Sequence, residues 1–245
     1  MINKIIHYCW FGKNEKPISV LKCIDSWKKY LPDYKIMEWN EDNINISDTV
    51  PYVRQAYDNK KWAFVTDYIR LKVLADYGGI YFDTDVEVFK SFDPFLSEKC
   101  FFGFESIDYL CTAVMGCEPG NRFICDFLES YNSRSFVKND GTLDTDTTNV
   151  VSMTMLLIKE GLKQNGKYQN LKDITIFPQY YFASNDIINV LHKYDSRIYS
   201  YHHCQASWYH SSRNGNFWDL LRHYIVGKLR NIIGTDKLYT LKQFV

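Results

Sequence analysis

The chain has 245 residues, of which 46% are hydrophobic and 17% aromatic, enough apolar material for one substantial core in one domain. Basic and acidic residues both number 29, so the formal net charge is zero. No overall field draws such a chain to a polyanion, and we expect no nucleic-acid partner.

The cysteines and the N-terminus bear on the compartment. Seven cysteines are scattered through apolar segments without a Cys-x-x-Cys pair or a zinc-ligand spacing, which predicts reduced core thiols. The first residues run straight into a strand-like segment without the apolar stretch of a signal peptide, and nowhere do 18 apolar residues follow one another. We therefore expect a cytoplasmic protein.

The first 40 residues predict a strand, a helix and a second strand. Residues 4–10 form a short apolar run that ends in a loop at 11–14. Apolar residues then recur at helical spacing between Pro17 and Pro32, and residues 34–39 alternate like a strand. This order favours an α/β sheet.

The middle of the chain continues the α/β pattern. Helical spacing over 63–77 ends at Gly78-Gly79, where a positive φ is needed, and residues 80–82 follow as a strand. Further strands are expected at 101–105 and 111–116, and further helices at 121–131 and 150–158. A polar loop over 132–149 is expected on the active-site side.

The C-terminal part contains a strand over 197–201 and a basic amphipathic helix over 216–233. We divide the chain into a catalytic domain, 1–215, and a helical extension, 216–245. One interpretation of the helix is packing onto the domain. The other is peripheral contact with a membrane, at the inner face of the plasma membrane, or with a lipid-linked acceptor.

The most informative motif is the acidic pair Asp83-x-Asp85. It follows an apolar strand directly, and open α/β sheets bind ligands at strand ends. Two carboxylates one residue apart can hold a hard cation such as Mn²⁺ or Mg²⁺, and a diphosphate can complete its ligand shell. A solvated turn is the alternative for an isolated motif of this kind.

Asp67 and Arg70 lie three residues apart on the helix before that strand, so they share one face. They could form an ordinary surface ion pair, which would contribute about 0–1 kcal/mol. Their apolar neighbours instead indicate that they point into a site. There the aspartate can accept hydrogen bonds from ribose and the arginine can orient phosphates or the sugar.

Further donor-binding candidates come from both ends of the chain. Near the C-terminus, His203 is assigned as a metal ligand, with His202 as the open alternative, because strand alternation places the two on opposite faces. Ser207 and the Trp208 N–H can donate to the departing phosphate. At the N-terminal strand, His7 and Trp10 could frame the base, although a core tryptophan is nearly as good an interpretation. The remaining donor-binding candidates flank the acidic pair: Tyr81 and Thr84.

These motifs resemble those of the DXD-containing sugar transferases, a family that includes bacterial capsular and exopolysaccharide glycosyltransferases and yeast mannosyltransferases that initiate outer-chain growth. The matching segments, in chain order, are Lys4–Gly12, Ser26-Trp27 with Glu38-Trp39-Asn40, Ala63–Arg70, Tyr77–Asp85, and His202-His203 with Ser207-Trp208. The resemblance implies a GT-A fold, a single-domain Rossmann-like mixed sheet flanked by helices. It also implies a divalent metal, usually Mn²⁺, and transfer with retention of configuration.

A more distant similarity is to the glucosyltransferase domains of large clostridial toxins. In those domains, equivalents of six residues surround the donor: Asp67, Arg70, Asp83, Asp85, Ser207 and Trp208. Two positions depart from the family pattern. Thr66 stands where a serine is common and keeps the hydroxyl, whereas Val150 replaces the proline that often follows Thr147-Thr148-Asn149, so the acceptor side is not defined by the resemblance.

The sequence thus predicts a metal-dependent retaining glycosyltransferase of capsular or exopolysaccharide synthesis. Its donor would be a nucleotide sugar, a UDP-sugar in the first instance and GDP-mannose as the alternative, and its acceptor a carbohydrate. Asp83, Asp85, Asp67 and Arg70 are the expected catalytic residues. Two other classes compete: a non-catalytic carbohydrate-binding protein, and a metal-dependent phosphohydrolase or nucleotidyltransferase. The second would normally show a phosphate-binding glycine-rich loop, and none is found.

Overall fold

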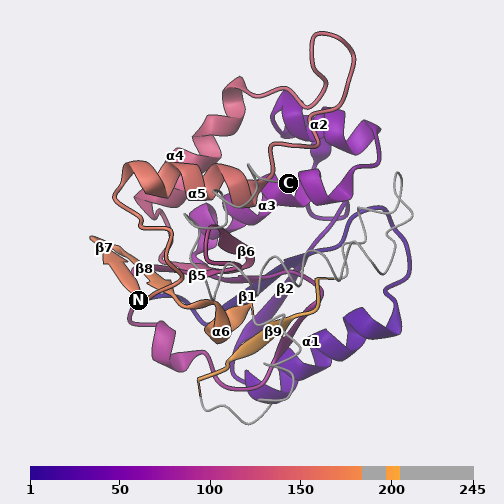
Figure 1. Cartoon of the computed structure of the whole chain (residues 1–245). Helices are drawn as coiled ribbons and strands as arrows, with labels where there is room; N and C mark the ends of the chain where they lie inside the picture. The colour runs from indigo at the N-terminus through magenta and orange to yellow at the C-terminus, as the bar shows by residue number, and fades with distance from the viewer. Residues whose placement is uncertain (184–196, 205–245) are drawn as a thin grey trace, which may run out of the picture. The chain divides into compact units, whose positions relative to one another are not determined.

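The computed structural model describes residues 1–183 and 197–204, all within one compact unit, Met1–Gln205 (Figure 1). Its centre is a seven-stranded sheet with the order β2-β1-β3-β6-β5-β8-β7. The strands of this sheet are β1 Ile5–Cys9, β2 Lys35–Trp39, β3 Gly79–Phe82, β5 Cys100–Phe104, β6 Leu110–Cys117, β7 Gln169–Leu171 and β8 Ile174–Phe177. A separate two-stranded sheet pairs β4, Val86–Val88, with β9, Ser200–His202.

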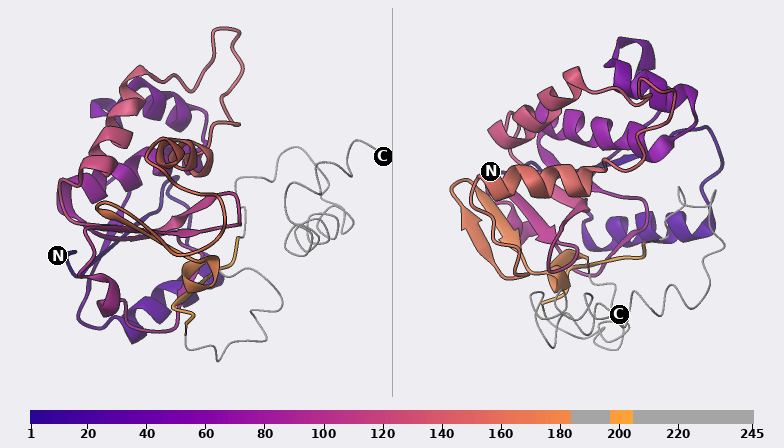
Figure 2. Two further views of the ribbon diagram at one scale, coloured as in Figure 1. Left: turned by 60° about the vertical axis from the view of Figure 1, so that its left-hand side comes forward. Right: turned by 45° about the horizontal axis from the view of Figure 1, so that its top comes forward.

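Helices cover both faces of the seven-stranded sheet (Figure 2). One face carries α2 Pro51–Asp58, α3 Trp62–Tyr77, α4 Arg122–Glu129 and α5 Asn149–Lys159. The other carries α1 Ile18–Tyr30 and the short α6 Gln179–Phe182. Three 3₁₀ turns complete the described elements: η1 Ile46–Asp48, η2 Asp93–Phe95 and η3 Ser130–Ser133. The predicted mixed α/β sheet flanked by helices is confirmed.

The core consists of two hydrophobic clusters, one on each side of the sheet. Helix α3 belongs to the larger cluster and is buried around most of its circumference, because α2 and α4 pack against it. An all-round apolar helix is expected in such a covered position. Asp67 and Arg70 are the charged members of this helix that are buried with it.

Strand directions place several strand ends at one edge of the sheet. β1 runs parallel to both β2 and β3, and β6 runs antiparallel to both β3 and β5. The carboxyl ends of β1, β2, β3 and β5 therefore lie at the same edge, where open α/β sheets bind ligands. We refer to this as the carboxyl edge of the sheet.

The connection from α3 to β3 requires glycine at both of its positions. Gly78 has a φ of +60°, and a Cβ added there would lie 2.5 Å from the Pro119 backbone nitrogen. Gly79 has a φ of +96°, and its Cβ would lie 2.7 Å from the Ile5 carbonyl oxygen. Both contacts are with backbone atoms, which could move only if the surrounding fold shifted. The two glycines thus let α3 turn directly into β3.

The predicted elements that fall within residues 1–183 and 197–204 are confirmed, with boundaries that differ by a few residues. Helix α2 was not predicted, although Pro51 stands at its first position, where proline is favoured. β7, β8 and α6 were also missed because they are short and lie among aromatic and polar residues without a clear period.

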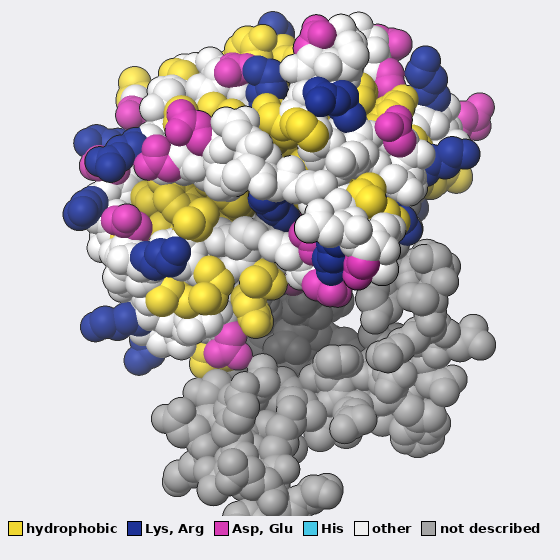
Figure 3. Space-filling view, turned by 90° about the horizontal axis from the view of Figure 1, so that it is seen from above, with side chains coloured by type: hydrophobic (Ala, Val, Ile, Leu, Met, Phe, Trp, Pro, Cys, Tyr) yellow, Lys and Arg dark blue, Asp and Glu magenta, His cyan; other side chains and the backbone are white. Residues whose placement is uncertain are grey.

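The placement of the cysteines and of the charged side chains largely agrees with what the composition predicts. Five cysteines are buried as free thiols, Cys125 is half-buried, and Cys204 is exposed, which the prediction of core thiols did not anticipate. On the face drawn in Figure 3, basic and acidic side chains are interspersed, as equal numbers of the two suggest. No helix within residues 1–183 and 197–204 is long and apolar enough to cross a membrane.

Candidate active site

The acidic pair lies in the turn between β3 and β4, at the carboxyl edge of the sheet. The Asp83 backbone N–H donates to the Ala113 carbonyl on β6 at 2.9 Å, and the Val86 N–H closes the turn onto the Asp83 carbonyl at 3.0 Å. β4 then pairs with β9, so that Val86 stands opposite His202. This register brings His202 Nε2 within 3.2 Å of an Asp85 carboxylate oxygen.

Asp83, Asp85 and His202 form a candidate metal centre. One ligand atom from each side chain lies within 4.8 Å of the others, and all three residues are half-buried. Two carboxylate oxygens and one imidazole nitrogen suit Mn²⁺, and the oxygens also suit Mg²⁺. Three protein ligands leave positions for ligands from a bound diphosphate, so these residues fit the ion that the sequence predicts.

The assignment of His203 as the metal ligand needs correction. The Nε2 atom of His203 lies 3.1 Å from Glu87 Oε2, and its backbone N–H donates to the Asp85 carbonyl at 3.0 Å. Successive side chains in an extended strand point to opposite faces. The β4–β9 register directs His202 to the acidic pair and leaves its neighbour to Glu87, a choice that alternation alone could not make.

The environment of His202 favours its protonated form. Burial lowers its pKa, but hydrogen bonds to Asp85, Cys111 and Cys204 outweigh burial and raise the pKa well above the usual value. A histidine must be neutral to ligate a metal. A cation that binds here therefore displaces a proton from His202.

Arg70 connects the metal centre to α3. Its Nη2 lies 3.2 Å from Asp67 Oδ1 and 3.3 Å from Asp83 Oδ1, and its Nη1 donates to the Thr112 carbonyl at 2.7 Å. The guanidinium also lies 4.8 Å from the centre of the Tyr81 ring. Because Arg70 is only 4% exposed, it acts as a buried bridge between two carboxylates.

Asp67 is held at the N-terminus of α5. Burial raises the pKa of its carboxyl to about 6, although Arg70 and the Asn149 backbone amide act in the opposite direction. The Asn149 side chain donates from Nδ2 to the Asp67 carbonyl at 2.7 Å and accepts from the Tyr131 hydroxyl at 2.5 Å. The sequence did not identify Asn149 as a site residue. The available signal was Thr148, a helix-capping residue that directly precedes it.

His7 does not belong to this site. It is fully buried, one ring nitrogen bonds to the Gly78 carbonyl at 2.8 Å, and the other accepts from Trp39 Nε1 at 3.1 Å. Burial lowers the pKa of His7 to about 4, so the ring is neutral at physiological pH. The prediction that His7 frames the base is therefore corrected: the residue braces β1 against β2 and the Gly78 turn.

The other predicted donor-binding residues lie in different surroundings. Tyr81 is 1% exposed and donates to Asp83 Oδ1 at 3.0 Å, so it orients a carboxylate rather than lining a binding surface. Thr84 is half-buried in the turn between the two acids. Trp10 follows β1 at the carboxyl edge, half-buried, with its indole N–H bound to the Asn14 carbonyl at 2.7 Å. Ser207 and Trp208 lie outside the described residues, as does the helix expected over 216–233.

Glu105 is an acidic residue that the sequence did not single out. It directly follows β5, which ends at the same edge as β3. Burial raises the pKa of its carboxyl, while His202 lowers it and Asp83 raises it further. These influences place Glu105 within electrostatic reach of the metal centre. The sheet order, rather than any local motif, puts it there.

Acidic and imidazole side chains at the carboxyl edge of a mixed sheet, backed by a buried Asp–Arg pair, form a candidate site for a metal ion and its phosphate ligands. Residues 17–102 match the family described as the glycosyltransferase sugar-binding region containing a DXD motif. This match confirms the resemblance to DXD-containing glycosyltransferases that the sequence motifs indicate, and the matched segment contains Asp67, Arg70, Asp83 and Asp85. The match supports the predicted enzyme class, a glycosyltransferase.

Two relatives come from yeasts. The chain is 30% identical over 132 residues to inositol phosphoceramide mannosyltransferase 3 of Schizosaccharomyces pombe, covering 53% of this chain and 37% of that protein. It is 30% identical over 112 residues to mannosyl phosphorylinositol ceramide synthase SUR1 of Saccharomyces cerevisiae, covering 44% and 28%. The chain thus spans about a third of the length of the relatives it matches.

Two solved structures also resemble the chain. One is the PaToxG glycosyltransferase, with 22% identity, a TM-score of 0.44 and coverage of 52% of this chain and 59% of that one. The other is a glycosyltransferase involved in the glycosylation of the major capsid of PBCV-1, with 12% identity, a TM-score of 0.46 and coverage of 82% and 94%.

The two adjacent histidines offer a direct test of the metal centre. We expect His202→Ala to weaken Mn²⁺ binding by at least about tenfold, because it removes one of three ligand atoms. His203→Ala should leave the affinity close to that of the wild type, since its imidazole faces Glu87. Isothermal titration with MnCl₂ measures both. A larger loss in the His203 variant would show that the β4–β9 register does not set the ligand.

Proposed function

We propose that the protein is a metal-dependent retaining transferase that moves a sugar from a nucleotide diphosphate donor to a carbohydrate acceptor. The observation that carries this proposal is the convergence of Asp83, Asp85 and His202 at the carboxyl edge. When bound by these residues, Mn²⁺ or Mg²⁺ would neutralise the charge that grows on the departing diphosphate.

In this proposal, the buried pair behind the metal centre fixes the geometry. The guanidinium of Arg70 contacts oxygen atoms of the protein itself. Its role is therefore to hold the Asp67 and Asp83 carboxylates in fixed positions rather than to bind the donor. The side chain of Asp67 is 12% exposed, which leaves one edge of its carboxylate open to accept hydrogen bonds from donor hydroxyls. Asn149 and Arg70 together keep that edge aimed at the site.

The donor and the acceptor follow from the relatives only as proposals. Both yeast proteins are named for mannose transfer, so GDP-mannose deserves the same weight as a UDP-sugar. One is named for inositol phosphoceramide and the other for phosphorylinositol ceramide, so the proposal includes a lipid-linked acceptor. We propose a role in capsular or exopolysaccharide synthesis at the cytoplasmic side of a membrane. Residues 216–233 would supply the peripheral contact, and Ser207 and Trp208 would meet the donor phosphate.

A donor screen tests the function. Purified protein is incubated with UDP-glucose, UDP-galactose, UDP-N-acetylglucosamine or GDP-mannose, with Mn²⁺ or with a chelator, and nucleoside diphosphate release is followed. Many transferases hydrolyse the donor slowly without an acceptor, so we expect release from one donor that depends on the metal. Metal-dependent release of inorganic phosphate from every nucleotide would indicate a phosphohydrolase. Binding of free glycan with indifference to all nucleotides would indicate a lectin.

A further inference from the structure

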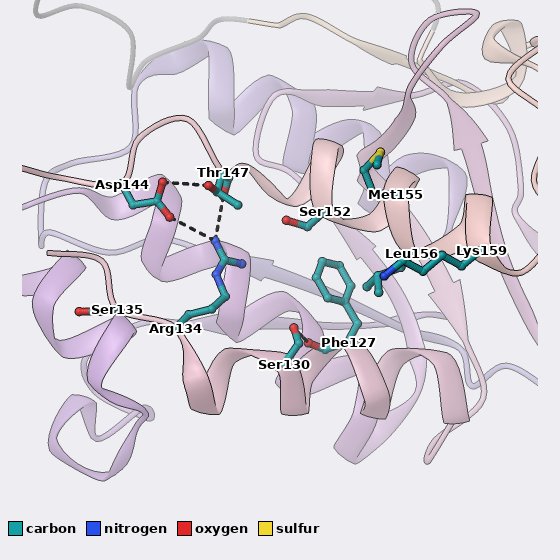
Figure 4. A pocket seen from close by; sticks show the side chains of 10 residues that line it. All are labelled: Phe127, Ser130, Arg134, Ser135, Asp144, Thr147, Ser152, Met155, Leu156 and Lys159. Atoms are coloured by element: carbon teal, nitrogen blue, oxygen red, sulfur yellow. Dashed lines mark hydrogen bonds and ion pairs between the residues drawn. The ribbon is translucent and has the colours of Figure 1, made fainter. Parts of the chain in front are cut away.

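A groove lies between α4 and α5, on the helical layer that covers α3 (Figure 4). Its cavity volume is about 490 Å³. The lining side chains come from α4, η3, the loop that follows and α5. They include Ser130, Arg134, Asp144, Thr147, Met155 and Lys159. None of them belongs to the metal centre.

The groove combines an apolar floor with hydroxyl groups on its walls. The Phe127 ring is buried beneath the groove at 1% exposure, whereas Met155 above it is 54% exposed and offers the apolar surface (Figure 4). The hydroxyls of Ser130 and Thr147 donate to protein oxygens at 2.6 and 2.9 Å, which leaves their lone pairs as acceptors. A sugar ring offers both an apolar C–H face and donor hydroxyls. A hydrocarbon chain would leave those lone pairs without partners.

Positive charge marks both ends of the groove. Arg134 lies at one end and Lys159 at the other, with Asp144 beside the arginine (Figure 4). The Arg134–Asp144 distance is 3.9 Å, and Lys138 approaches the same carboxylate at 4.0 Å. Asp144 is therefore shared between two cations, and the lining keeps an excess of positive charge.

Arg134 is held in a way that presents its free N–H groups. Its guanidinium lies 4.4 Å from the centre of the Tyr131 ring and 4.7 Å from that of Tyr52. Within residues 1–183 and 197–204, the one hydrogen bond of its side chain runs from Nη2 to the Thr147 carbonyl at 2.9 Å. A planar guanidinium held against two aromatic rings that contact each other is well suited to bind a carboxylate through two N–H groups.

The Arg134 end of the groove adjoins the metal side of the molecule. Tyr131, whose ring contacts Arg134, donates its hydroxyl to Asn149, and Asn149 in turn bonds to Asp67. Helix α5 begins at Asn149 and ends at Lys159, so it runs along the groove from the Asp67 side outward. The Arg134 end of a saccharide lying in the groove would thus adjoin the hydrogen-bonded series that leads from Tyr131 through Asn149 to the backbone of Asp67.

We propose that this groove binds the acceptor as an acidic saccharide, with a uronic acid carboxylate on Arg134 and a neighbouring sugar against Met155. This inference rests on the proposed function, because it makes the groove the acceptor end of the same site. It adds the acceptor class, an anionic glycan, and the residues that select it.

Methionine methyl resonances test the groove directly. The chain has five methionines, and Met155 lies in the groove, so carbon-13 labelling of the methyl groups gives a simple spectrum. The probes are a hyaluronan tetrasaccharide, which alternates glucuronic acid with N-acetylglucosamine, and chitotetraose, its neutral counterpart. We expect the Met155 signal to shift on titration with the acidic probe. The affinity for the neutral probe, measured from the same signal, should be at least about tenfold lower.

Variants separate the charge from the fold. Lys159→Gln should weaken binding of the acidic probe about threefold. Arg134→Lys should weaken it about tenfold, because lysine keeps the charge but lacks the planar guanidinium that can donate two parallel hydrogen bonds. Lys163→Gln, an exposed lysine outside the groove, is the matched control and should have no effect. If Arg134→Lys fails to fold, Lys159→Gln still tests the charge.

Two results would overturn the inference. Equal Met155 shifts with both probes would remove the acidic selectivity, and an unmoved Met155 signal at millimolar probe would remove the groove as a binding site. Neither result touches donor hydrolysis, which the donor screen measures without any acceptor. A failed donor screen with an intact Met155 response would instead remove the transferase proposal and leave a binding groove.

Discussion

Asp85→Asn is expected to reduce donor turnover by at least about a hundredfold at ordinary Mn²⁺ concentrations. The substitution keeps the size of the side chain but removes a charged ligand, and it also weakens the partner that orients His202. The fold should survive, because Asp85 lies in a turn whose backbone bonds are unchanged. Nucleoside diphosphate release with the preferred donor measures turnover, and thermal unfolding checks the fold.

Glu87→Gln is the matched control for this variant. Glu87 lies two residues further along, contacts His203 and is not part of the metal centre. Its neutralisation should leave turnover near the wild-type value. Near-normal turnover in Asp85→Asn, or an equal loss in both variants, would contradict a specific role for the Asp83–Asp85–His202 centre.

Arg70→Met is expected to lower the free energy of unfolding by about 3–5 kcal/mol near pH 8. Arg70 is buried and contacts both Asp67 and Asp83, so its removal leaves two carboxylates close together without their shared cation. Urea denaturation in the absence of added metal measures the loss. Methionine keeps most of the side-chain volume, so the loss reports on charge rather than on a cavity.

The loss in Arg70→Met should depend on pH. The pKa of Asp67 is about 6 even with Arg70 in place, above the value of about 4 in an unfolded chain. A carboxyl with a raised folded pKa stabilises the fold at low pH, and that contribution is lost as pH rises through the folded pKa. Without the arginine, this pKa rises further. The deficit of the variant should therefore be smaller near pH 5 than near pH 8.

Lys72→Met provides the comparison on the same helix. Lys72 forms an exposed pair with Asp76 at 2.9 Å, and exposed pairs contribute about 0–1 kcal/mol. Its removal should change stability little at either pH. If the two variants lost equal stability, or if the Arg70→Met deficit were the same at both pH values, Arg70 would not be the bridge described above.

The local parts of the site could be predicted from the sequence because their geometry is set by short-range spacing. Asp83-x-Asp85 directly follows a strand, and Asp67 and Arg70 share one face of a helix, so neither inference needed tertiary information. The same is true of Gly78-Gly79, where the chain must turn without side chains. Asp67, Arg70, Asp83 and Asp85 do lie close together in the structure.

Other parts depended on pairings between distant segments. The choice between His202 and His203 is made by the register of β9 on β4, which no local pattern encodes. Asn149 reaches Asp67 only because α5 packs with its N-terminus over α3.

The misassignment of His7 has a related cause. Its position at a strand end favoured a binding role, yet Trp39 and the Gly78 carbonyl, both distant in sequence, occupy its ring nitrogens. Whether a histidine at such a position is a ligand or a core residue depends on neighbours that a single sequence does not reveal.

The strand that carries His202 has a further consequence for how the molecule is made. β9 is separate from the seven-stranded sheet and pairs with β4. β4 is synthesised more than 100 residues before β9. A chain that emerges from the ribosome N-terminus first exposes the two aspartates well before their histidine. The growing polypeptide therefore carries Asp83 and Asp85 without His202 for nearly half of its synthesis, and the three residues can come together only after every strand of the central sheet has been made.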